Sequence, residues 1–376
     1  PFVGKLSFIK VLSGRLTATS NAVNARTGQP ERLGKTLTVC GKKQTDTPEI
    51  AAGDIGAVAK LATAKTGDTL CDPARVVALP APVYPISSYR MAVKVAKKGD
   101  EGKVGSALAR LIEEDPAIRF VVDPETKQQI ISGLGTQHLE VALAKLKNKF
   151  GVEITLENPR VPYRESIRKS CKAQGRHKKQ TGGSGQFAKV LMNFEPLDTE
   201  NGETYEFVNE VTGGHITKEF IPSIDAGVQE AMESGILAGF PVVGVKATVT
   251  DGQVHDVDSS EMAFKIAGSM CFKEAAPKAK PVILEPIMKV EVRTPEEYMG
   301  EVIGDLNQRR GNIQSMTDGV GVKVIDAKVP LSEMFGYIGD LRSKTQGRAM
   351  FTMQMDSYAE VPKNVSEEII KAQRGE

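Results

Sequence analysis

The sequence contains no tryptophan, and only four of its 376 residues are cysteines and only four are histidines. The cysteines lie tens of residues apart and form no CxxC pair; they are Cys40, Cys71, Cys171 and Cys271. This spacing argues against a disulfide framework and a zinc ribbon, and it favours a reducing compartment. The histidines are also scattered, and no two have the i, i+4 spacing of a helical zinc site. We therefore expect no metal site.

Long apolar runs are missing as well. No run reaches the roughly 20 residues that a membrane-spanning helix needs, and no signal-like segment opens the chain. We therefore expect no membrane partner and a cytoplasmic location. Because the chain begins at Pro1 rather than at an initiator Met, a removed targeting peptide and an organellar stroma or matrix stay open as alternatives.

The P-loop pattern G-x4-G-K-[ST] is absent. Its nearest approach is Gly34-Lys35-Thr36, but Gln29 stands where the first glycine belongs, and Gly28 is one residue away. P-loop GTP hydrolysis needs the backbone N–H groups of such a loop to hold the phosphates. The sequence thus predicts neither a GTP nor a Mg²⁺ site, and we expect no GTP hydrolysis by this chain alone.

One string, His255-Asp256-Val257-Asp258-Ser259, contains the residue types of a hydrolytic triad. Triads are assembled from separated segments by geometry, so adjacency in sequence is no evidence for one. We predict no catalytic residue, and a metal-dependent hydrolase would need clustered ligands that the sequence lacks.

What the sequence does contain is a series of short structural units. Residues 1–82 hold short strands at 3–9, 37–39 and 55–59, separated by turn residues. This spacing predicts a small β-barrel. We expect it to be N-terminally incomplete, because the chain begins almost inside a strand. Pro80, Pro82 and Pro85 then predict a stiff linker.

Two later regions repeat one order of elements. Residues 83–157 and 284–361 both show the β-α-β-β-α-β order of a ferredoxin-like domain. In each region, strand-like alternation of apolar and polar residues is interrupted twice by stretches in which apolar residues recur at helical spacing. In the second region, Thr294 followed by Pro295 and Glu297 predicts a capped helix start. Asp318-Gly319 predicts a hairpin turn.

Between them, residues 158–283 predict a central α/β domain with helices near 223–236 and 259–275. The second helix is preceded by Asp258-Ser259-Ser260-Glu261, a capping-box pattern, and its apolar positions include Met262, Ile266 and Met270. The charged C-terminal tail, residues 362–376, is expected to fray. The predicted fold class is thus multidomain α+β: a truncated β-barrel, two ferredoxin-like domains and a central α/β domain with exposed tip loops.

Positive charge gathers at the start of the central domain, although the whole chain carries only +2. Between positions 160 and 189, only Glu165 opposes nine basic residues: Arg160, Arg164, Arg168, Lys169, Lys172, Arg176, Lys178, Lys179 and Lys189. Such a patch attracts phosphate backbones by releasing their counterions. We take the middle of this run, Arg168, Lys169, Lys172, Arg176, Lys178 and Lys179, as a predicted basic patch; a merely solvated strand face is the alternative.

Two loops near this patch are candidate RNA contacts. The first contains Gly182, Gly183, Ser184, Gly185 and Gln186. Its glycines let backbone N–H groups approach a ligand, and the amide of Gln186 suits base edges or 2′-hydroxyls. The second loop, residues 250–256, precedes the capped helix and carries His255 and Asp256. An ordinary hairpin tip and a solvated histidine are the alternatives.

These strings resemble elongation factor G. Residues 182–187 and 255–265 are similar to the two tip loops of its domain IV. Residues 52–55 and 66–70 resemble domain II, residues 113–116 and 131–135 resemble domain III, and residues 284–286 and 311–313 resemble domain V. The matches are collinear and extend over essentially the whole chain.

The resemblance implies the ribosome-facing part of a translational GTPase, whose GTP and Mg²⁺ belong to an N-terminal domain that we expect to be missing here. Domain IV would reach the decoding centre, where Gly182, Gly183, Gly185, Gln186 and His255 would touch the tRNA–mRNA duplex. Domain V would dock at the large-subunit GTPase-associated region, and domain III would couple the nucleotide state to movement. The implied partner is the ribosome with its RNA, and we expect a monomer.

Two departures from the family pattern qualify this implication. Ser184 stands where the family often has arginine, and Thr136-Gln137 stand where it usually has Glu-Leu. The first departure concerns one phosphate contact, and the second concerns a coupling contact and fits a diverged or organellar paralogue. A ribosome-recycling paralogue and a stand-alone RNA-binding module without a GTPase stay open, whereas the tip strings look unlike those of ribosomal protection proteins.

Overall fold

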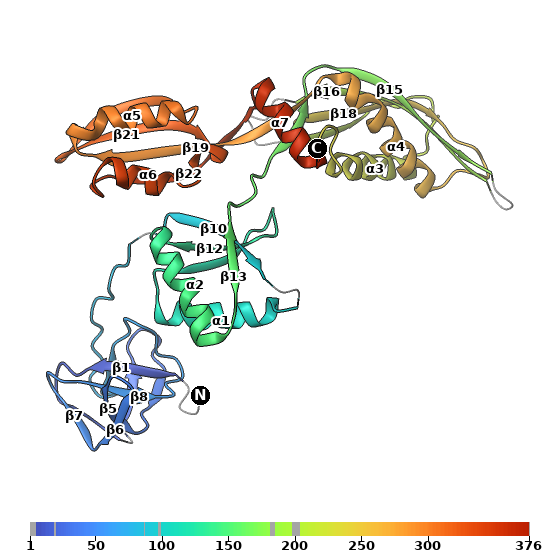
Figure 1. Cartoon of the computed structure of the whole chain (residues 1–376). Helices are drawn as coiled ribbons and strands as arrows, with labels where there is room; N and C mark the ends of the chain where they lie inside the picture. The colour runs from blue at the N-terminus through green and yellow to red at the C-terminus, as the bar shows by residue number, and fades with distance from the viewer. Residues whose placement is uncertain are drawn as a thin grey trace. The chain divides into compact units, whose positions relative to one another are not determined.

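The computed structural model describes residues 5–18, 20–85, 87–96, 99–180, 185–197 and 204–375 (Figure 1). The chain divides into two units, Pro1–Val122 with Gln129–Glu157, and Asp123–Gln128 with Asn158–Glu376. In the described ranges, no helix is long and apolar enough to cross a membrane.

Short strands fill the first 73 residues. They are β1 (Leu6–Lys10), β2 (Arg15–Thr17), β3 (Asn21–Asn24), β4 (Pro30–Arg32), β5 (Thr36–Cys40), β6 (Lys43–Thr47), β7 (Glu49–Ala51), β8 (Ile55–Ala59) and β9 (Leu70–Cys71). They pair in three sheets, ordered β1-β8-β5-β6, β2-β7 and β4-β3-β9, so no closed barrel forms among the residues described. Leu33, Val58 and Leu61 are the largest members of the buried core.

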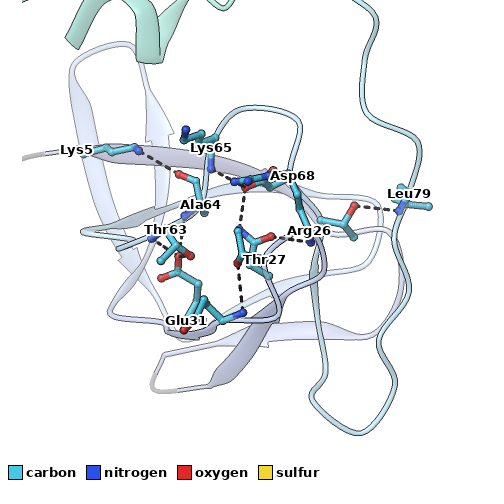
Figure 2. A network of polar contacts seen from close by, with 12 residues as sticks. Lys5, Arg26, Thr27, Glu31, Thr63, Ala64, Lys65, Asp68 and Leu79 are labelled. Carbon is cyan, nitrogen blue, oxygen red and sulfur yellow. Dashed lines mark hydrogen bonds and ion pairs between the residues drawn. The ribbon is translucent and has the colours of Figure 1, made fainter. Parts of the chain in front are cut away.

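Two carboxylates hold the loop that joins β8 to β9 (Figure 2). Glu31 is only 2% exposed. It accepts hydrogen bonds from the N–H groups of Ala62, Thr63 and Ala64 at 2.9, 2.5 and 2.7 Å, and from the Thr63 hydroxyl at 2.6 Å. The loop is therefore tied to β4 by charge-assisted hydrogen bonds.

Asp68 is the second of these carboxylates (Figure 2). Its oxygens accept from Arg26 Nε at 2.6 Å and Nη2 at 2.8 Å, from Asn24 Nδ2 at 2.8 Å, and from the Lys65 N–H at 2.9 Å. The Arg26 guanidinium lowers the pKa of Asp68 well below its usual range; burial opposes this effect, and the other two donors reinforce it.

The next region is β10 (Tyr89–Val95), α1 (Glu101–Glu114), β11 (Arg119–Val122), β12 (Gln129–Gly133), α2 (Thr136–Phe150) and β13 (Ile154–Glu157). The strands are antiparallel in the order β11-β12-β10-β13, and the two helices share a core with the sheet. This confirms the first predicted ferredoxin-like region.

The second ferredoxin-like region is β19 (Pro281–Thr294), α5 (Met299–Gln308), β20 (Asn312–Gly319), β21 (Val322–Pro330), α6 (Tyr337–Lys344) and β22 (Met350–Glu360). Its order, β20-β21-β19-β22, repeats that of the first region. Two local predictions were wrong. Thr294 is the buried last residue of β19 and makes no cap, because a 3-10 turn at Glu296–Tyr298 precedes α5. The hairpin turns at Val320-Gly321 instead of 318–319, since Gly319 pairs with Val322 and Gly321 has a φ of 71°.

The central region contains β14 (Arg164–Ile167), β15 (Cys171–Lys179), β16 (Gln186–Pro196), β17 (Tyr205–Asn209), α3 (Ile221–Glu233), β18 (Val245–Gln253) and α4 (Glu261–Ala275). Four strands form a sheet in the order β15-β16-β18-β17, with β17 parallel to β18. Alternate residues of β16, Ala188 to Phe194, are buried against α3 and α4. Alternation places Arg176, Lys178 and Lys189 on the opposite face of the sheet.

Helix α4 lies against its neighbours through small residues. A Cβ on Gly227 of α3 would lie 2.0 Å from the Lys265 carbonyl oxygen, and one on Gly175 of β15 would lie 2.0 Å from that of Ala267. The predicted apolar face of α4 was therefore wrong: Met262 and Met270 are 59% and 43% exposed, while alanines, Gly268 and two phenylalanines are buried. Its N-cap is Ser260, whose hydroxyl accepts from the Ala263 N–H at 3.2 Å, and not Asp258.

The C-terminal tail does not fray as expected. It forms α7 (Lys363–Arg374), whose Val365, Ile369 and Ile370 pack in a cluster with Ile283 and Val361. Strand β14 pairs with the first residues of β19 at the same place. The 14-residue β19 thus joins the central region to the second ferredoxin-like region.

Candidate nucleic-acid interface

The ends of β15, β16 and β18 bring two distant stretches of sequence together. Lys179 pairs with Gln186, and Lys189 pairs with Gln253. The Phe187 N–H donates to the Asp258 carbonyl oxygen at 2.8 Å, and the Ser259 hydroxyl, 72 positions further along the chain, donates to the Phe187 carbonyl oxygen at 2.8 Å. Residues 185–187 and 253–259 therefore form one surface, which we term the tip.

Gly185 lies directly against the second stretch. A Cβ at this position would lie 2.7 Å from Asp258 Oδ2, closer than a side chain allows. A side chain at position 185 would therefore require the Asp258 carboxylate to move away from the loop. The other predicted residues of this loop, Gly182, Gly183 and Ser184, lie outside the described residues.

His255 is held by the turn that leads into α4. Its backbone N–H donates to Ser259 Oγ at 2.9 Å. Its ring Nδ1 accepts from the N–H groups of Asp258 at 3.2 Å and Val257 at 3.4 Å, while 54% of the side chain stays exposed. Asp256 is exposed in the same turn. Backbone N–H groups therefore engage Nδ1 of the imidazole, while the ring as a whole remains accessible to a ligand.

Cations line the open face of the sheet beside the tip. Arg176 and Lys178 alternate with residues that face the helices, and Lys189 lies opposite Arg176 on β16. Together with the tip they surround a hollow of about 470 Å³. Its lining residues are Gln174, Arg176, Lys178, Lys179, Gln180, Gln186, Phe187, Lys189, Gln253, Val254, His255 and Asp258.

The predicted basic patch is not a single cluster. Only Arg176, Lys178 and Lys179 of its members line the hollow. Lys172 lies at the other end of the nine-residue β15, roughly 20 Å from Lys178 at about 3.3 Å per residue. Arg168 and Lys169 precede β15; Arg168 Nε donates to Glu360 Oε2 at 2.8 Å, and the Lys169 N–H donates to the Ala279 carbonyl oxygen at 3.0 Å.

Glu165 does not oppose the patch either. It is fully buried. Its carboxylate accepts the N–H groups of Ile236, Leu237, Ala238 and Phe240 at 2.5–3.1 Å. The acid that looked like a partial counter-charge in the sequence is a structural brace.

Four residues of the tip and of the strands beside it were missed as site residues from sequence: His177, Phe187, Lys189 and Gln253. Their signal was the period-two alternation of 172–178 and of 187–189, which assigns alternate side chains to one face once the strands are paired. The pairing itself could not be read from sequence. His215 is another of the isolated histidines of the sequence. Its Nδ1 lies 2.7 Å from Asp251 Oδ1, and this hydrogen bond lowers the pKa of Asp251.

The glycines nearest to a P-loop pattern do not fit a nucleotide. Gly28, with a φ of 69°, closes the turn between β3 and β4. Lys35 Nζ donates to Asp46 at 2.8 Å, and Thr36 begins a strand, not the helix that a phosphate loop precedes. Among the described residues, no group of three or more His, Cys, Asp or Glu side chains could hold a metal ion.

Comparison with known families assigns each of these regions. Models for elongation factor G match in order: domain 2 at residues 1–73, domain III at 80–158, domain IV at 159–280 and the C-terminus at 282–369. The chain belongs to the elongation factor G family. The tip and its hollow thus lie in domain IV, and the second ferredoxin-like region is the family's C-terminal domain.

A solved structure is similar to this chain over its whole length. The chain is similar to a protein from Thermus thermophilus, with a TM-score of 0.81 and 35% sequence identity. The match covers 100% of this chain and 56% of the Thermus chain. The elongation factor G domains described above therefore span about half the length of that relative.

Proposed function

We propose that this chain is the ribosome-binding part of an elongation factor G and promotes tRNA–mRNA translocation by pressing the domain IV tip against RNA. One observation carries the proposal. Two loops far apart in sequence meet at one end of the domain IV sheet, beside a hollow lined by Arg176, Lys178, Lys179 and Lys189. A strip of cations beside polar tip residues suits a nucleic-acid backbone.

The mode of action that fits is mechanical. A domain that transmits a push needs a firm connection to its neighbour. Strand β19 runs without a break from its pairing with β14 into the C-terminal domain sheet, and α7 packs over the junction. Domain IV and the C-terminal domain would then move as a pair.

The finer assignments come from the family resemblance. The tip would contact the tRNA–mRNA duplex in the decoding centre, the C-terminal domain would contact the large-subunit GTPase-associated region, and domain III would relay the nucleotide state. GTP and Mg²⁺ would serve a further domain, with no cofactor held by this chain. We propose a monomer that acts in the cytoplasm or in an organellar stroma or matrix.

The test is ribosome pelleting at several salt concentrations. A triple variant, Arg176→Ala, Lys178→Ala and Lys189→Ala, is compared with a control triple of equal charge change, Lys218→Ala, Lys273→Ala and Lys371→Ala. We expect weaker binding and a shallower salt dependence for the first triple, by roughly 0.7–0.9 in log–log slope for each lost phosphate contact. Equal binding by the two triples at every salt concentration would contradict the proposal.

A further inference from the structure

His177 lies beneath the tip, on the face of β15 opposite to Arg176 and Lys178, and is partly buried. Its Nε2 is 2.9 Å from Gln186 Oε1. An amide oxygen only accepts hydrogen bonds, so Nε2 must carry the proton. With its oxygen engaged in this way, Gln186 has its amide NH₂ left to act as a donor.

The hydrogen bonds of His255 assign its tautomer in the same way. Its Nδ1 accepts two backbone N–H groups, so Nδ1 is unprotonated and the proton resides on Nε2. Gln186 and His255 therefore both offer N–H groups. The carboxylates of Asp256 and Asp258 disfavour a phosphate beside His255. The cations Arg176, Lys178 and Lys189 favour a phosphate on the open face of the sheet instead.

We propose that His177 is a positioning residue: it holds the Gln186 amide with its NH₂ outward, so that Gln186 and His255 recognise neutral acceptor atoms of RNA. Suitable acceptors are the 2′-oxygen, base carbonyl oxygens and unprotonated ring nitrogens. The RNA phosphates lie instead along Arg176, Lys178 and Lys189. This inference rests on the proposed function. It adds that the protein donates and the RNA accepts in these contacts, and that His177 sets this direction.

A double-mutant cycle tests the role of His177. Binding of the full chain to 70S ribosomes programmed with mRNA and tRNA is measured for His177→Phe, Gln186→Ala and the combination. Loss of the Gln186 hydrogen bond should weaken binding about 5-fold. His177→Phe should weaken it 2- to 5-fold in the parent and not at all in the Gln186→Ala background, because the group it positions is gone. Equal weakening in both backgrounds would show a merely structural role and overturn the proposal.

Two further variants test the polarity. His177→Gln keeps an N–H donor in the place of Nε2 and should bind like the parent. Gln186→Glu keeps the acceptor for His177 but replaces the outward donor by a carboxylate oxygen, so it should bind more weakly than Gln186→Ala. If Gln186→Glu binds as well as the parent, or if His177→Gln fails to restore binding, the inference is wrong. The salt dependence that supports the proposed function would survive either result.

Discussion

At the scale of single residues, Glu31 and Glu165 are two buried acids that each hold a loop. Each is at most 2% exposed, and each accepts several backbone N–H groups of one loop. An ionised carboxylate is stable in such a place only when its oxygens are saturated by donors. Glu31 therefore holds residues 62–64, and Glu165 holds loop 235–240.

The loop held by Glu31 should respond to acid. Burial raises the pKa of Glu31, but the Thr63 hydroxyl and the N–H groups of residues 62–64 lower it by more. Because the folded-state pKa lies below the unfolded value of about 4.3, the stabilisation is complete above that value and is lost as the pH falls through the folded pKa. We expect amide exchange of residues 62–64, corrected for its intrinsic pH dependence, to accelerate below about pH 4. Unchanged protection at pH 3 would contradict this account.

Removing the Glu165 carboxylate should be costly. Glu165→Ala leaves four N–H groups without their acceptor, of which that of Ala238 is buried and the other three are part-buried. A buried unpaired N–H group costs about 1–3 kcal/mol, and the part-buried groups cost less because water can reach them, so we expect a total loss on the order of 3 kcal/mol. The exposed Glu233 on α3 supplies the control, since Glu233→Ala should change stability by less than about 0.5 kcal/mol. Urea unfolding followed by amide exchange in domain IV measures both, and coincident midpoints would refute the brace.

At the scale of elements, close approach of helices organises domain IV. Glycines on α3, α4 and β15 allow backbone to touch backbone. We expect Gly227→Ala to force α3 and α4 apart at a cost of about 1–3 kcal/mol. Gly304→Ala, on α5 where a Cβ meets nothing within 4 Å, should instead stabilise its helix by up to about 1 kcal/mol. Exchange protection of the two helices distinguishes these outcomes, and similar effects of both changes would speak against the packing argument.

Helix α7 depends on a small apolar face. Ile369→Ala removes part of the cluster around Ile283 and Val361 and should cost about 1–2 kcal/mol. Lys371→Ala, on the exposed face, should have little effect. Amide exchange of residues 363–374 should therefore accelerate only in the first variant; equal protection would mean that the helix is held by something else.

The elements were more predictable from sequence than their contacts. Both β-α-β-β-α-β orders follow from local periodicity, and the structure confirms them. The buried face of α4 was not predictable, because Met262 and Met270 looked apolar while the packing relies on alanine and glycine. The tail looked frayed because its apolar side chains are few among many charges, and only their packing against Ala238, Ile283 and Val361 explains why they order.

For the candidate site as well, local features were predictable from sequence and contacts between distant segments were not. The strings of the two tip loops were recognisable, and their described parts do meet. The linear run of cations gave a false impression of one patch, because an extended strand separates its ends and alternates its faces. Which cations share a face depends on the pairing of β15 with β16, and this non-local information is absent from any short stretch of sequence.

At the scale of the whole molecule, the chain combines four elongation factor G domains. Its net charge of +2 is too small to identify an RNA-binding protein. Local arrangement matters more, because four cations meet around one hollow at the end of domain IV. We therefore expect RNA contact to be concentrated at this end of domain IV, with little contribution from its other exposed surfaces.

Site-specific photocrosslinking on programmed 70S ribosomes tests that claim most directly. A photoreactive phenylalanine analogue replaces Asp256 at the tip or, as the control, Glu233 on the exposed side of α3, and crosslinked RNA is located by primer extension. The account predicts light-dependent RNA crosslinks from position 256 and few or none from position 233. Crosslinks from position 233 with none from position 256 would contradict it.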